Sequence, residues 1–270
     1  MKHKTPSTSA VVGPAGKLRV TSEGEGGMPA LFIHDNAADA SHWAETQHSL
    51  QTHTVAFDLR GVGDSGGGHG PFGVDAAVED VAAVADALLP ERFVIVGHGF
   101  GAAVAGAFAS YYPERLAGLL LVEPGPDLRK TPQAERDALL EHFSVSRYGA
   151  FSEQWLAPLL MGAKPATRNL VLATLHTSRR EAVAGNLESL FHYNPADPFE
   201  GFTGLIHALV SSVGPKTLVG ERPSLSHKLA PHASHWLMLD APQWFHTELV
   251  QFLGIARHAE ADRNAATQRA

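Results

Sequence analysis

Residues 94–105 read V-I-V-G-H-G-F-G-A-A-V-A, and this stretch decides the fold. The apolar run at 92–96 predicts a buried strand, and the small residues from Phe100 to Tyr112 predict a helix that follows it directly. Gly97 and Gly101 would let strand and helix pack closely. Such a sharp strand-to-helix turn exposes the side chain at its centre, and here that residue is Gly99.

Strands and helices alternate on both sides of this turn. Short apolar runs at 29–34, 54–59 and 116–122 predict buried strands, and helical spacing occurs at 41–50, with Ser41 as its N-cap, and at 74–89. Strands that alternate with helices indicate a parallel sheet. Residues 128–200 are helix-rich, and the alternation resumes with a strand at 205–211 and a helix at 242–255.

We therefore predict an α/β protein with a mostly parallel central sheet, flanked by helices and interrupted by a helical cap. The core would comprise residues 17–127 and 201–257, the cap 128–200, a flexible N-terminal arm 1–16, and a flexible tail 258–270. A cap inserted between strands would lie above the carboxyl edge of the sheet, where open α/β sheets bind ligands.

Composition narrows the class of function. The net charge of -7 argues against nucleic-acid binding, and the absence of cysteine excludes disulfides and thiolate metal sites. No apolar run reaches the roughly 18 residues of a membrane span, and no signal peptide is recognisable. The 16 histidines show no metal-ligand spacing. We expect a cytoplasmic protein without cofactor or metal that acts on a small molecule, does not bind a membrane, and could form a homodimer.

Several segments, taken in order, resemble the α/β-hydrolase superfamily, in its branch of small capped serine hydrolases. These segments are I-H-D-N-A-A-D-A-S-H-W at 33–43, F-D-L-R-G-V-G-D-S at 57–65, the turn at 97–101, Y-P-E-R-L-A-G-L-L-L-V-E-P at 112–124, and A-S-H-W-L-M-L-D-A-P at 233–242. The resemblance covers roughly residues 18–125 and 205–255. It implies the α/β-hydrolase fold, in which the turn at 97–101 is the nucleophile elbow.

The resemblance also implies a site. Ser-His-acid catalysis needs a hydroxyl nucleophile, a histidine base, an acid that orients this base, and backbone donors for the oxyanion. The family positions correspond to Gly99 for the nucleophile and His235 for the base. For the acid, Glu123 at the end of a buried strand is favoured over Glu221 and Asp127, and Glu221 qualifies only if residues 216–220 form a strand. The oxyanion donors would be the N–H groups of Phe100 and Asn36, and His34, Trp155 and Trp236 would border the substrate pocket.

Two departures from the family pattern stand out. Gly99 replaces the nucleophilic serine, and Asp35 stands where the loop after the first buried strand usually has glycine. Residues 63–67 read G-D-S-G-G and satisfy the G-x-S-x-G pattern, but no small-residue helix follows them. We interpret that segment as a structural turn, with the Ser65 hydroxyl bonded locally.

Three functions are open at this point. The chain could be an esterase-like hydrolase scaffold, inactive or weakly active because Gly99 lacks a hydroxyl. It could be a cofactor-free, lyase-like enzyme with His235 as general base, or a protein that binds a small ligand without catalysis. The first reading predicts that Gly99→Ser raises esterase activity by orders of magnitude and costs about 1 kcal/mol of stability through backbone strain.

Overall fold

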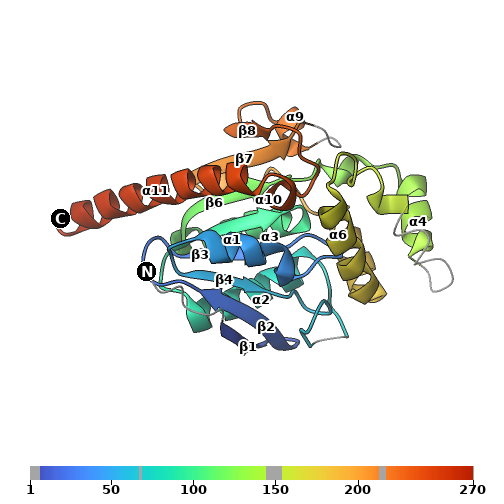
Figure 1. Cartoon of the computed structure of the whole chain (residues 1–270), viewed down its shortest axis with the longest axis horizontal. Coiled ribbons are helices and arrows are strands. Elements are labelled where there is room, and N and C mark those ends of the chain that lie inside the picture. The colour runs from blue at the N-terminus through green and yellow to red at the C-terminus, as the bar shows by residue number, and fades with distance from the viewer. Residues whose placement is uncertain (1–6, 67–68, 144–153, 213–216, 270) are drawn as a thin grey trace.

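The computed structural model describes residues 7–66, 69–143, 154–212 and 217–269. In these residues eight strands form one sheet in the order β1-β2-β4-β3-β5-β6-β7-β8 (Figure 1). β1 pairs antiparallel with β2, and β2 with β4, whereas the remaining neighbours are parallel. The strands are β1 (Ser7–Gly13), β2 (Gly16–Glu23), β3 (Ala30–Ile33), β4 (Thr54–Phe57), β5 (Phe93–His98), β6 (Leu116–Val122), β7 (Leu205–Ser211) and β8 (His227–Ala230).

Helices cover both faces of this sheet, so the predicted fold class is confirmed. The helices of the core are α1 (Ala44–Ser49), α2 (Val74–Leu88), α3 (Phe100–Tyr111), α9 (Leu218–Glu221), α10 (Leu237–Asp240) and α11 (Pro242–Thr267). Short 3-10 turns are η1 (Ala40–Trp43), η2 (Pro113–Arg115) and η3 (Leu128–Lys130). Between β6 and β7 lie α4 (Gln133–His142), α6 (Pro165–Thr177), α7 (Arg180–Leu190) and α8 (Pro198–Gly201).

Each central strand contributes to two separate cores, because successive side chains point to opposite faces. In β5, Ile95 packs in the cluster formed with α2 and α3, whereas Val94 and Val96 pack in the cluster that contains residues of α11. All three side chains are buried completely. Burial on both faces explains why this strand reads as a continuous apolar run.

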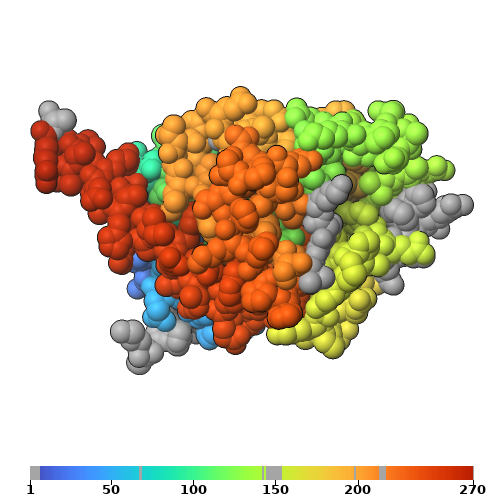
Figure 2. Space-filling view, turned by 90° about the horizontal axis from the view of Figure 1, so that it is seen from above, coloured from blue at the N-terminus to red at the C-terminus, as the bar shows by residue number. Residues whose placement is uncertain are grey.

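The helices between β6 and β7 form a cap at the carboxyl end of the parallel strands. Figure 2 shows the yellow-green segment that contains α4 and α6 at one end of the molecule, beside the orange and red C-terminal segments. The far end of α11 projects from the opposite end (Figure 1). None of the helices in the described ranges combines the length and apolarity that a membrane span requires.

The chain ends differ from the prediction of a flexible arm and tail. Residues 7–13, expected in the arm, form β1, whose backbone pairs with β2 along its whole length. Helix α11 continues to Thr267, well past the expected end of the core at residue 257. Ser41 is also not the cap of the helical segment after β3, because the Asp39 side chain accepts the N–H of Ser41 instead.

Candidate active site

The turn between β5 and α3 has the geometry of a sharp elbow. Gly99 lies at its centre with φ of 53° and ψ of -111°, a conformation that residues with a side chain rarely adopt. The flanking glycines allow close approach: a Cβ on Gly97 would lie 2.2 Å from the carbonyl oxygen of Gly101. The sequence prediction of a tight strand-to-helix junction therefore agrees with the structure.

The carboxylate of Asp35 fills the space that a side chain at position 99 would need. A Cβ on Gly99 would lie 2.1 Å from Oδ1 of Asp35 and 2.3 Å from its Cγ. Oδ1 also accepts the N–H of Phe100 at 2.6 Å, which is the predicted oxyanion donor. The two departures from the family pattern are thus one spatial feature, since the side chain absent from the elbow is replaced by one from the loop after β3.

The loop that carries Asp35 is hydrogen-bonded to the cap. Asn36, the next residue, donates from its side chain to the carbonyl of Val183 in α7 at 2.9 Å. The amide of Asn186, also in α7, donates to the side-chain oxygen of Asn36 at 3.3 Å. We find no acceptor for the backbone N–H of Asn36 within the described part of the chain, so its predicted role as an oxyanion donor stays a prediction. The side-chain contacts of Asn36 explain how cap and core together position Asp35.

His235 lies on the other side of Asp35, in the loop between β8 and α10. Its Nε2 is 2.9 Å from Oδ2 of Asp35. The loop is fixed by Asp240, whose carboxylate accepts the N–H and hydroxyl of Ser234 and the hydroxyl of Thr167 in the cap. These bonds hold the backbone of the loop next to His235 in place.

Glu123 follows β6 and faces the second ring nitrogen of His235. Its Oε2 is 3.4 Å from Nδ1 of His235, within ion-pair distance, and neither atom has a hydrogen-bond partner among the described residues. Oε1 of Glu123 accepts the N–H of Ser211 in β7, which fixes the carboxylate. The backbone of Glu123 has a φ of 49°, a conformation that is unfavourable for a residue with a side chain and is common at functional sites.

These groups make a buried row in the order Asp35, His235, Glu123. Burial would lower the pKa of His235, but the hydrogen bond to Asp35, the close carboxylate of Glu123 and the charges of both outweigh this and raise it to about 9. Burial would likewise raise the pKa of Asp35, but the hydrogen bond and charge of His235 hold it below its ordinary value. At neutral pH His235 is therefore an imidazolium beside the Asp35 carboxylate, and in this resting state His235 is an acid.

His98, which precedes Gly99 in the elbow, contacts the backbone and the ring of His235. Its Nε2 lies 2.9 Å from the carbonyl oxygen of His235, and the two rings are 4.5 Å apart. Burial, together with the charge of His235, lowers the pKa of His98 to about 3, so this ring is neutral and donates from Nε2. His98 thus holds the His235 backbone and stays out of the cavity, in agreement with the sequence interpretation.

A cavity of about 590 Å³ opens above this row. Asp35, Gly99, Glu123 and His235 are among the residues that line it. Its walls are mostly apolar side chains of the core and cap, among them Phe100, Leu121, Leu128, Leu139, Trp155, Leu159, Leu187, Leu190, Phe191, Tyr193, Phe199 and Leu218. The volume and lining suit a small, largely apolar ligand.

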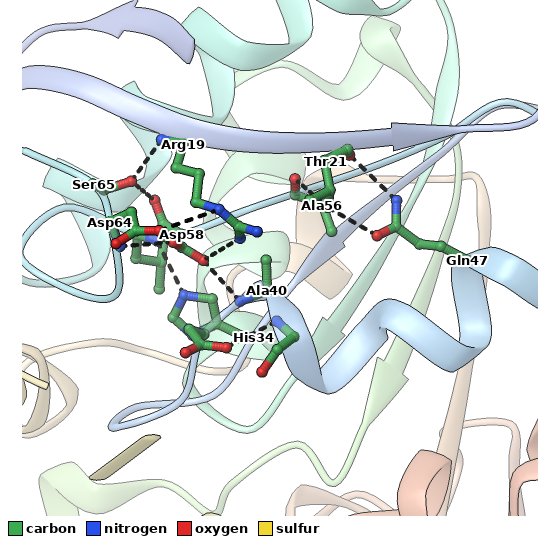
Figure 3. Close-up of polar contacts among 12 residues, drawn as sticks. Arg19, Thr21, His34, Ala40, Gln47, Ala56, Asp58, Asp64 and Ser65 are labelled. Atoms are coloured by element: carbon green, nitrogen blue, oxygen red, sulfur yellow. Dashed lines mark hydrogen bonds and ion pairs between the residues drawn. The ribbon is translucent and has the colours of Figure 1, made fainter. Parts of the chain in front are cut away.

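Some predicted site residues lie elsewhere. Trp155 lines the cavity, but His34 and Trp236 are not among the described residues that line it. His34 is buried between two loops, where its Nδ1 donates to the carbonyl of Asp35 at 2.7 Å and its Nε2 accepts the N–H of Leu59 at 3.0 Å (Figure 3). Trp236 is buried in the core below α10, packed edge-on against the His235 ring. Both residues support the loops of the site from outside the cavity.

The alternative acids are also remote. The segment from Leu218 to Glu221 is a short helix and not the end of a strand, so the condition for Glu221 fails. Glu221 is ion-paired with Lys130 at 3.1 Å and accepts the N–H of Asp127. Asp127 is ion-paired with Arg129 at 2.8 Å. Of the three candidates, only Glu123 contacts His235.

One group of described residues could offer three ligand atoms to a metal ion. Candidate ligand atoms of Asp35, His98 and His235 lie within 4.8 Å of one another. The Asp35–His235 hydrogen bond and the bond from His98 to the His235 carbonyl already engage these side chains. The arrangement suits proton transfer within a hydrogen-bonded row.

Sequence reasoning found Glu123 and His235 but missed Asp35. The sequence departs from the family pattern at two positions, with Asp35 in place of glycine and Gly99 in place of serine. An acidic residue in a loop that otherwise carries glycine, together with a missing nucleophile, could have indicated that one compensates for the other.

Comparisons with known proteins show the family of the chain. A family model described as the alpha/beta hydrolase fold matches residues 28–195. The chain is 25% identical over 249 residues to the dihydrolipoyllysine-residue acetyltransferase component of the acetoin cleaving system of Pseudomonas putida, covering 85% of this chain and 64% of that protein. It is 22% identical over 277 residues to epoxide hydrolase 3 of Mus musculus, covering 88% of this chain and 74% of the mouse protein.

Solved structures show the same fold. A thermophilic esterase from Thermogutta terrifontis superposes with a TM-score of 0.78 at 20% identity, covering 93% of this chain and 99% of the esterase. The chain spans less than two thirds of the acetyltransferase component, so that protein's full activity does not transfer from the match.

Proposed function

Because the chain belongs to the alpha/beta hydrolase fold family, we propose that it hydrolyses a small, largely apolar ester or related acyl substrate. The observation that carries this proposal is the row Asp35, His235, Glu123, which lines a mostly apolar cavity. The cavity would hold the acyl and alcohol parts, and the row would supply proton transfer at the ester bond. The esterase fold of similar architecture supports the same class of reaction.

The chemistry of the row favours hydrolysis over the other two functions. A general-base reaction by His235 needs a neutral ring, but the pKa of about 9 keeps that ring protonated at neutral pH. An imidazolium is instead suited to protonate a leaving alcohol. A binding protein would gain nothing from an ion pair buried beside an apolar pocket, because burying charges costs free energy.

The expectation of an inactive enzyme rested on an empty nucleophile position. Position 99 lacks a side chain, but the space it leaves holds the Asp35 carboxylate. The protein therefore carries a reactive group at the elbow, and we expect turnover from the chain as it stands.

The test is hydrolysis of p-nitrophenyl acetate, butyrate and octanoate by the purified protein and by His235→Gln. We expect His235→Gln to lower kcat/KM by roughly 10²–10⁴-fold, the usual contribution of acid–base catalysis. His258→Gln, which changes an exposed histidine of α11, is the matched control and should behave as the unchanged protein. Equal rates for the unchanged protein and His235→Gln on all three esters would contradict the proposal.

A further inference from the structure

The placement of Asp35 at the elbow points to a chemical role that no comparison assigns to it. Its carboxylate occupies the volume of the missing side chain, lines the cavity, and is bonded through one oxygen to the Phe100 N–H and through the other to His235. We propose that Asp35 is the covalent nucleophile of this site, supplied by the loop after β3 in place of the elbow residue. This inference rests on the proposed ester hydrolysis.

The surroundings of Asp35 favour nucleophilic attack over simple structural pairing. The side chain is only 12% exposed, so most of the water that would solvate its charge is excluded. The two hydrogen bonds fix the carboxylate plane and leave no rotation to be frozen in the reaction. Carboxylates of aspartate do form covalent intermediates in other enzymes.

The first step transfers the acyl group to Asp35. Oδ2 forms a bond to the acyl carbon, the bond from that carbon to the leaving oxygen breaks, and the leaving oxygen takes the Nε2 proton of His235. The result is a mixed anhydride on Asp35, a free alcohol or phenol, and a neutral His235. Losing the negative charge of Asp35 favours the neutral ring, because that charge raises the pKa of His235.

The second step regenerates the site. Neutral His235 takes a proton from water, the hydroxide oxygen bonds to Cγ of Asp35, and negative charge develops on Oδ1. The Phe100 N–H already lies 2.6 Å from this oxygen, where it can stabilise that charge. The bond from Cγ to Oδ2 then breaks and releases the carboxylate product, and Asp35 loses its new proton to solvent. In this step the Phe100 N–H therefore stabilises an oxygen of Asp35 and not an oxygen of the substrate.

The same chemistry defines the substrate class. When a carboxylate adds to an ester carbon, the intermediate expels the weaker base of its two leaving groups. For an alkyl ester that weaker base is Asp35 itself, whereas a phenolate or enolate competes with it. The inference therefore predicts aryl or enol esters with small, apolar groups as substrates, and poor turnover of simple alkyl esters.

Isotope labelling tests the covalent step directly. The protein in excess over phenyl acetate is allowed one turnover in ¹⁸O-water, and the peptide that contains Asp35 and the acetate are analysed by mass spectrometry. We expect ¹⁸O in the Asp35 carboxylate and unlabelled acetate. Turnover with labelled acetate and an unlabelled Asp35 would overturn the nucleophile while leaving the proposed hydrolysis intact. No turnover of phenyl acetate, with p-nitrophenyl esters also untouched, would overturn both.

Variants supply the second measurement. Asp35→Asn should lower kcat on phenyl acetate by roughly 10³-fold or more, as expected for loss of a nucleophile. Asp64→Asn removes an exposed carboxylate from another loop and should leave kcat unchanged. If Asp35→Asn does not fold, the unchanged protein still decides the matter: a phenyl acetate rate no greater than its ethyl acetate rate would overturn the predicted substrate class.

Discussion

Two turns of this protein follow parallel strands, and they contrast in motif and in position. The loop after β4 contains Ser65 in a complete G-x-S-x-G pattern, whereas the elbow after β5 has lost its serine at Gly99. The Ser65 hydroxyl donates to the carbonyl of Asp58 at 2.6 Å and accepts the N–H of Arg19 at 2.9 Å (Figure 3). Both hydrogen bonds are made to nearby residues of the core, and Ser65 is not among the described residues that line the cavity.

The turn at Gly99 differs from the Ser65 loop in both respects. It has no reactive side chain of its own, yet it lies beside His235 and the cavity, and the site there is completed by Asp35. The difference teaches that placement relative to the histidine and the sheet edge defines this site, and that a matching local pattern does not.

The largest effect should come from the acid behind His235. Glu123→Gln keeps the size of the side chain but removes the charge that stabilises the imidazolium, so we expect kcat on phenyl acetate to fall by roughly 10³–10⁴-fold. Glu221→Gln changes the exposed alternative acid and should leave kcat unchanged. Steady-state kinetics of both variants decide the assignment, and a loss at Glu221 alone would show that the elbow's acid lies elsewhere.

The second effect concerns the exchange of side chains between positions 35 and 99. In Gly99→Ser the new Cβ would overlap Oδ1 of Asp35, so Asp35 must leave the Phe100 N–H. We expect kcat/KM to fall by about 10²–10³-fold, the cost of a lost oxyanion contact, and not to rise as the sequence alone suggested. Strain and overpacking should cost about 2–4 kcal/mol of unfolding free energy, more than the sequence-based expectation of about 1 kcal/mol.

The double variant Asp35→Gly with Gly99→Ser is the matched control. It removes the overlap and places a hydroxyl next to His235, so urea unfolding should show part of the stability returned and ester turnover should exceed that of Gly99→Ser. Additive losses from the two changes would mean that these positions do not interact.

The third effect is a pH dependence of the free energy of unfolding, which arises from the row Asp35, His235, Glu123. Asp35 and Glu123 raise the pKa of His235 from its ordinary 6.5 to about 9, so His235 binds a proton more tightly in the folded state. The resulting stability is fully present below about pH 6.5 and is lost as the pH rises through about 9. Unfolding in urea across this range, with ¹⁵N NMR of the His235 ring, measures it. A ring that titrates near its ordinary value would disprove the charged row.

The smallest effect on activity is expected at the other turn. Ser65→Ala removes two local hydrogen bonds and should cost about 1–2 kcal/mol of stability while ester turnover stays unchanged. Thermal unfolding and the p-nitrophenyl ester assay measure the two quantities together. A strong loss of turnover with an intact fold would give the G-D-S-G-G segment a role that its contacts do not explain.

The sequence by itself indicated the alternation of the central strands and helices, and with the family resemblance it predicted Glu123 and His235 as members of the site. Buried parallel strands read as continuous apolar runs. The resemblance to the family offered Glu123 as an acid, and its place directly after an apolar strand, where a carboxylate needs a partner, favoured it. His235 came from a segment similar to one in the family. Such features depend on residues close in sequence, which is why they can be read without coordinates.

Only the tertiary structure decided the rest. The pairing of β1 with β2 depends on a strand partner and not on the polar composition of residues 7–13, and α11 continues to Thr267 as an exposed helix that no apolar pattern marks. The fit of Asp35 into the space at Gly99 joins residues that follow two different strands, β3 and β5, and Asn36 fixes it by bonding to the cap. Steric complementarity between distant segments leaves no periodic trace in either one, so the group that completes this site became visible only when the chain was folded.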